Sequence, residues 1–74
     1  MKAYVAIQPD FEHEVQDVVL IIEDQNFKRT CWISGFDDVE WEAANAFAEK
    51  VAKTLSVEFV GEIEEYIDEL ESEQ

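Results

Sequence analysis

The side chains of this chain that are numerous enough and closely enough spaced for chemistry are carboxylates. Of its 74 residues, 19 are Asp or Glu and only 5 are Lys or Arg, which gives a formal net charge of -14. The excess is concentrated after Gly35, and no Lys or Arg follows Lys53. Carboxylates at this density could serve acid–base catalysis, metal binding or contact with a basic macromolecule.

Catalysis and metal binding are both poorly matched by the residue pattern. His13 is the only histidine. It lies in a polar stretch with no serine or cysteine placed as a nucleophile, which is typical of a surface side chain. The acidic groups in residues 37–42 and 62–69 contain neither a calcium-loop pattern nor a Glu-x-x-His pair. A chain this short also leaves little room for a pocket that separates two carboxyl pKa values. We expect no enzyme, no metal site and no cofactor.

The C-terminal acidic residues repeat at the spacing of a helix face. Like charges at this spacing oppose a helix by roughly 0.2–0.5 kcal/mol per pair, so stability does not explain them. We therefore predict a partner-binding surface formed by Glu58, Glu62, Glu64, Glu65, Asp68, Glu69 and Glu71. A secondary partner-binding patch is predicted at Asp37, Asp38, Glu40, Glu42 and Trp32.

In size, net charge and these acidic rows, the chain resembles, as a class, the small acidic nucleic-acid mimics of phages and mobile elements. This class includes many anti-CRISPR proteins and inhibitors of restriction or repair enzymes. The resemblance covers about half of the chain and contains no family motif. It implies a stoichiometric inhibitor or regulator that occupies the DNA- or RNA-binding channel of a basic protein or nuclease complex, and so evades antiviral defence. Direct binding to nucleic acid or to a membrane is not expected, because both are anionic.

Two other classes of function remain open beside this one. An acidic structural or assembly module could homodimerise through its sheet or its second helix, with the acidity serving solubility. Adaptation to high salt would make the charge a matter of solubility alone, although 13 Glu against 6 Asp and the concentration of charge in one half argue mildly against it.

Three strands are predicted in the first half of the chain, over residues 2–8, 15–23 and 27–34. Residues 18–22 are apolar and rich in β-branched side chains, and a polar turn separates them from the third strand at hairpin distance. Alternation sends Val18, Leu20 and Ile33 toward the predicted helices. We expect Val19, Ile21 and Trp32 on the opposite face, as an exposed patch. The alternative is a register shifted by one residue, which would place Trp32 in the core.

Helices are predicted for the second half. Asp37 and Glu40 have the spacing of a capping box for a helix that ends near Leu55, with one apolar stripe formed by Ala44, Phe47, Val51 and Leu55. Ser56 could cap a second helix over residues 57–71; the alternative is a short fourth strand at 57–60 that ends at Gly61.

The expected fold is α+β, with one domain over residues 1–74. A three-stranded antiparallel sheet is packed by two C-terminal helices in the order βββαα. Cys31 is the single cysteine and excludes an internal disulfide, and the apolar run 18–22 is far shorter than the roughly 20 residues that cross a bilayer. Because the first residues are typical of a strand and not of a signal peptide, we expect a soluble cytoplasmic protein.

Overall fold

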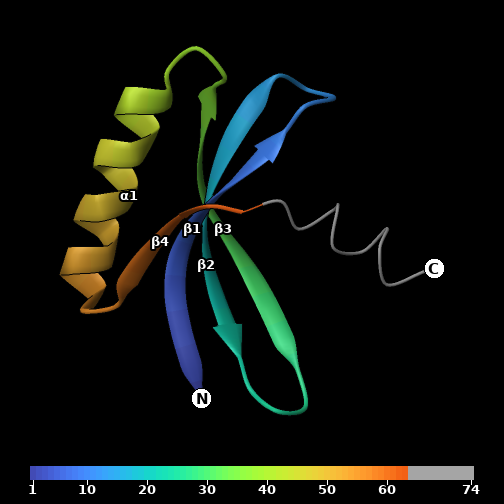
Figure 1. The fold of residues 1–74 in the computed structure, drawn as a ribbon, viewed down its shortest axis with the longest axis vertical. Coiled ribbons are helices and arrows are strands. Elements are labelled where there is room, and N and C mark those ends of the chain that lie inside the picture. The colour runs from blue at the N-terminus through green and yellow to red at the C-terminus, as the bar shows by residue number, and fades with distance from the viewer. Residues whose placement is uncertain (64–74) are drawn as a thin grey trace.

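The computed structural model describes residues 1–63, which form a four-stranded sheet with one helix against one face (Figure 1). The elements are β1 (Lys2–Asp10), β2 (Val15–Glu23), β3 (Lys28–Asp37), α1 (Trp41–Leu55) and β4 (Glu58–Glu62). The strand order is β3-β2-β1-β4; β2 is antiparallel to both β1 and β3, whereas β4 is parallel to β1. The α+β class is confirmed, but the sheet has four strands and not three, and residues 1–63 contain one helix.

The first two strands follow the alternation in the sequence, and β2 has the predicted bounds. β1 continues through Pro9 to Asp10, two residues past its predicted end. The Ile7 carbonyl accepts a hydrogen bond from Ile63 N–H (2.8 Å), so Pro9, two residues on, turns its nitrogen to the same side. β4 has already ended there, and the missing N–H of proline therefore interrupts no strand pairing.

β3 also runs further than predicted, through Gly35 to Asp37, and this delays the helix. α1 begins at Trp41, so a cap at Asp37 is wrong; Glu40 occupies the cap position without a side-chain cap hydrogen bond. The Glu40 N–H donates to the Asp37 carbonyl (2.9 Å), and the Glu40 carboxylate accepts a hydrogen bond from the Asp37 N–H (3.2 Å). The pair predicted to cap the helix instead closes the turn that leads to it.

Ser56 ends α1 and does not begin a second helix. Its backbone is left-handed (φ 58), and the Ser56 and Val57 N–H groups donate to carbonyls of the last helical turn. The chain then enters the sheet as β4, with Gly61 at φ 87 where the pairing with β1 is irregular. The alternative of a short fourth strand is confirmed, but it spans Glu58–Glu62, so it begins one residue later than predicted and continues through Gly61. The second helix from Val57 is wrong, and its remainder at 64–71 lies outside the described residues.

Ser56→Gly is expected to raise the free energy of unfolding by about 1 kcal/mol, because glycine adopts the left-handed conformation without the steric cost of a Cβ. Urea unfolding followed by circular dichroism measures this change. Ser56→Ala keeps the Cβ and should give no such gain, and equal effects of the two substitutions would contradict the explanation.

The helix side of the sheet holds the larger core. Ala44, Ala48 and Ala52 of α1 are buried against Val5, Ile7 and Val18 of the sheet, with Leu20, Ile33, Phe36, Phe47 and Val51 around them. The predicted stripe is thus partly wrong: three alanines form its centre, and Leu55 is 48% exposed. Small side chains allow the helix axis to approach the sheet closely.

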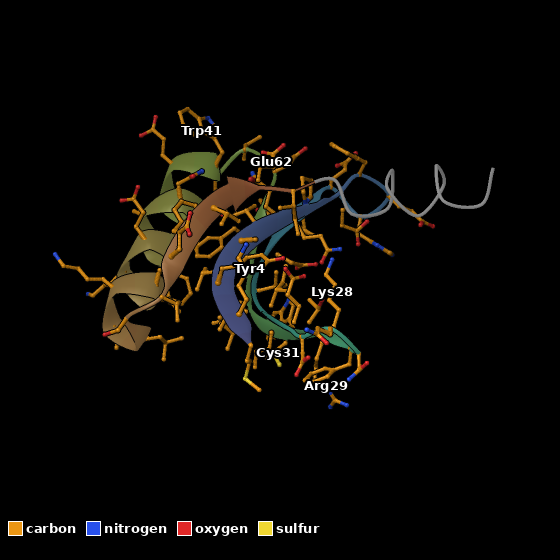
Figure 2. The ribbon with its side chains drawn as sticks, turned by 60° about the horizontal axis from the view of Figure 1, so that its bottom comes forward. Tyr4, Lys28, Arg29, Cys31, Trp41 and Glu62 are labelled. Carbon is orange, nitrogen blue, oxygen red and sulfur yellow. The ribbon has the colours of Figure 1, made fainter. Side chains whose placement is uncertain are left out.

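The opposite face of the curved sheet carries a second, smaller core (Figure 2). Ala6, Val19 and Ile21 are buried there, with Tyr4 and Ile63 packed against them. The expectation that Val19 and Ile21 form an exposed patch is therefore wrong, since their exposed fractions are 2% and 0%. Trp32 lies on this face and is 66% exposed.

The helix of residues 1–63 is too short and too polar to cross a membrane.

A carboxylate-rich end as the candidate binding surface

The topology gathers acidic residues from every element at one end of the sheet. β1, β3 and β4 finish at this end, while β2 and α1 begin there. Figure 1 shows the connection between β1 and β2 and the start of α1 at the same, upper end. We call this surface the acidic end; it comprises Asp10, Glu12, Glu14, Asp17, Asp37, Asp38, Glu40, Glu42 and Glu62.

The cations of the chain lie at the other end. Lys2 begins β1, Lys28 and Arg29 begin β3, and Lys50 and Lys53 belong to the second half of α1. Figure 2 shows Lys28 and Arg29 away from Trp41 and Glu62. Four further carboxylates of residues 1–63 are interspersed with these cations, at Glu23, Asp24, Glu49 and Glu58. Within residues 1–63, one end therefore has mixed charges, and the other carries nine carboxylates and no Lys or Arg.

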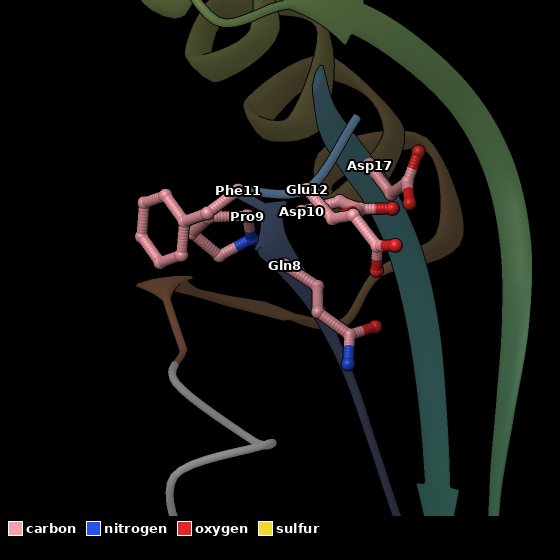
Figure 3. A pocket seen from close by; sticks show the side chains of 6 residues that line it. All are labelled: Gln8, Pro9, Asp10, Phe11, Glu12 and Asp17. Atoms are coloured by element: carbon pink, nitrogen blue, oxygen red, sulfur yellow. The ribbon is translucent and has the colours of Figure 1, made fainter. Parts of the chain in front are cut away.

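Two hollows flank the connection between β1 and β2. The first, of about 500 Å³, is lined by Asp10, Glu12 and Asp17 together with Gln8, Pro9 and Phe11. Figure 3 shows the three carboxylates on one side of this connection and the Phe11 ring on the other. Asp17 also accepts a hydrogen bond from the Trp32 indole N–H (3.1 Å), which holds an exposed aromatic ring beside the hollow.

The second hollow, of about 260 Å³, brings together carboxylates from four parts of the chain. Asp10, Glu14, Asp38 and Glu62 line it with Trp41 and Gln16. Gln16 donates a side-chain hydrogen bond to the Asp38 carbonyl (2.9 Å), and the Asp38 N–H donates to the Glu14 carbonyl (3.1 Å). These bonds tie the turn before α1 to the connection between β1 and β2, so the backbone at Glu14 and the backbone at Asp38 lie close together.

Asp10 and His13 are hydrogen-bonded at the acidic end, with 2.8 Å between His13 Nδ1 and Asp10 Oδ2. The side-chain hydrogen bond from His13 holds the pKa of Asp10 below 3.8, assisted by the His13 backbone N–H and partly opposed by desolvation. A folded-state pKa below the unfolded one stabilises the fold above the unfolded value, and this contribution is lost as pH falls through the folded value.

Asp10→Asn is accordingly expected to lower the melting temperature at pH 7, and the difference from the native chain should vanish as the pH falls below 3.8. The effect should be small, because both side chains are at the surface. Thermal unfolding between pH 2 and pH 7 measures it, with Glu49→Gln as a control remote from His13. A difference independent of pH would contradict the assigned cause.

The structure places the predicted site residues unevenly. The secondary patch of Asp37, Asp38, Glu40 and Glu42 is part of the acidic end, with Trp32 near its rim. Glu62 belongs to this end, whereas Glu58 lies at the other end of β4, so a helical row through both is wrong. The remaining predicted residues, Glu64, Glu65, Asp68, Glu69 and Glu71, lie outside the described residues.

Four members of the acidic end were missed by the sequence reasoning: Asp10, Glu12, Glu14 and Asp17. The signal that could have found them is the predicted antiparallel order of the first three strands. The end of the first strand, the start of the second and the end of the third must then share one end of the sheet. Acidic residues from three parts of the sequence, 10–17, 37–42 and Glu62, combine there into one surface.

Within residues 1–63, no three His, Cys, Asp or Glu side chains lie where they could hold a metal ion together. The acidic end extends over the connection between β1 and β2, the turn before α1 and the last residue of β4. Such a surface suits contact with a broad basic surface.

Comparison of the chain with protein-family models, with curated proteins and with solved structures gave no match. Function is therefore inferred from the charge and geometry of the acidic end.

Proposed function

We propose that this protein is a stoichiometric inhibitor or regulator whose acidic end occupies a basic channel of a nucleic-acid-binding protein or nuclease complex. The observation that carries the proposal is the segregation of charge. Nine of the thirteen carboxylates in residues 1–63 lie at one end, and all five Lys and Arg residues lie at the other. The activity would be of the anti-CRISPR or anti-restriction kind.

Segregation matters because a carboxylate beside a lysine is already neutralised, whereas one without a nearby cation keeps its full field. A groove lined by Lys and Arg that normally tracks phosphates would accept such a surface in place of the nucleic acid. Aromatic rings dominate the energetics of many protein interfaces. Phe11 (64% exposed) and Trp41 (58% exposed) stand among the carboxylates and supply this apolar contact.

Local stability accounts for only part of the acidic end. Glu40 and Glu42 lie at the start of α1, where the helix dipole favours negative charge, and Lys53 lies in the last turn, where it favours positive charge. No helix terminus belongs to the connection that contains Glu12 and Glu14. Crowding like charges there destabilises the compact state, which supports a role in binding a partner.

Capture from a host lysate on the immobilised protein tests this proposal. We expect one basic nucleic-acid-binding protein or nuclease complex to be retained, to elute as salt rises, and to be released by excess DNA or RNA. The released protein should lose nucleic-acid binding when one equivalent of this chain is added. Retention that neither salt nor nucleic acid reverses would rule out mimicry.

A further inference from the structure

β3 is an edge strand twice as long as the strand at the other edge. It spans ten residues, Lys28–Asp37, against five in β4, and within residues 1–63 no strand pairs with its outer side. The outward backbone N–H and C=O groups of such a strand form a template for a further strand. In Figure 1, the lower half of β3 lies on the side of the sheet remote from α1, and its upper end leads to the start of α1.

An apolar groove follows this edge on the helix side. It has a volume of about 540 Å³ and lies between α1 and β3, lined by Leu20, Cys31, Ile33, Phe47, Val51 and Leu55, with Lys50 and Thr54. The groove exists because α1 covers the sheet incompletely toward β3. On the other face, Trp32 at the middle of β3 is exposed. Apolar surface thus borders the edge on both faces, as at an interface core.

The charges along β3 indicate what kind of strand could pair with this edge. The strand begins with Lys28 and Arg29 and ends at Asp37, followed by Asp38. When a second β3 pairs antiparallel about a two-fold axis near Ile33, Lys28 and Arg29 of each copy lie beside Asp37 and Asp38 of the other copy. A parallel arrangement would oppose like charges, which disfavours it.

We propose that a second copy of this chain occupies this edge, so that two β3 strands pair antiparallel and join the sheets into one of eight strands. The two grooves then meet on the same face, beside the two-fold axis, and their apolar linings are covered together. At physiological salt the Debye length is about 8 Å, so contacts across the strand pair outweigh the repulsion between the net charges of the two copies. The dimer does not rest on the proposed inhibition, because Asp10 and Glu62 lie on β1 and β4, away from the paired edge, and stay accessible.

Opposite charge changes test the pairing on the full chain. The native chain is expected to sediment as a dimer of 8.6 kDa protomers at concentrations on the order of 100 µM in 150 mM salt. Arg29→Glu sets a new carboxylate against Asp37 of the other copy, and Asp37→Lys sets a new ammonium group against Arg29 of the other copy. Because each change recurs at two symmetric contacts, each variant alone should weaken dimerisation roughly tenfold or more.

An equimolar mixture of the two variants should dimerise again, since one Arg29–Asp37 contact is kept and the other is replaced by its charge-reversed form. Lys2→Glu and Glu58→Lys make the same kinds of charge change on β1 and β4 and should leave the dimer intact. Circular dichroism verifies that every variant is folded. A native chain that stays monomeric, or a mixture that does not recover, would overturn the proposal and leave the groove to a different protein's apolar segment.

Discussion

Replacement by lysine of the four carboxylates around the Trp41 hollow is expected to weaken binding to the proposed basic partner by a hundredfold or more. These residues are Asp10, Glu14, Asp38 and Glu62. Each change turns an attraction into a like-charge contact, and like-charge juxtaposition across an interface costs several kcal/mol. Because every 1.4 kcal/mol corresponds to a factor of about ten, the combined loss removes capture at physiological salt. Single replacements should have modest effects, since the contact is spread over many carboxylates.

A matched variant separates the position of the charges from their sum. Glu23, Asp24, Glu49 and Glu58 are the four carboxylates outside the acidic end in residues 1–63, and changing them to lysine gives the same net charge. This variant should bind within a few-fold of the native chain. Affinities measured for both by surface plasmon resonance decide the matter. Equal losses would show that only net charge counts, and no loss in either variant would refute the role of the acidic end.

The sequence was sufficient for elements that local patterns define. β2 is a β-branched run between polar turns, and its bounds were predicted correctly. α1 was placed with its correct end at Leu55, although the turn at Asp37 and Glu40 lies before the helix. Such signals depend on neighbours along the chain, so one sequence reveals them.

Elements that form only because another part of the chain pairs with them could not be predicted from local sequence patterns. Residues 57–60 are a short apolar run that suits a strand or a helix equally. The run becomes β4 because β1, between β2 and β4, is buried on both faces: Ala6 lies in one core and Ile7 in the other. That central place depends on the strand order, which the residues of β1 do not encode locally.

The acidic end shows the same division. The net charge follows from composition, but which carboxylates become neighbours depends on the conformation between them. Glu58 and Glu62 would share a face of a helix. In β4 the same two residues are separated along the strand, with Glu58 beside Tyr4 and Glu62 beside Ile7. Asp10 and Asp38 are distant in sequence, yet the sheet places them around one hollow.

Ala48→Leu is expected to lower the free energy of unfolding by about 1–3 kcal/mol, because a larger side chain is forced into a close-packed contact. Ala48 is completely buried between α1 and the sheet, at the centre of the three alanines that let the helix approach Val5 and Ile7. A domain of this length has a total stability of roughly 4–11 kcal/mol, so the loss is a large part of it. Ala46→Leu makes the same change at an exposed position of the same helix and should have little effect. Urea unfolding of both variants measures the difference. If Ala48→Leu proved as stable as Ala46→Leu, α1 would not lie against the sheet through its alanines, and the turn that carries Asp38 to the acidic end would lose its support.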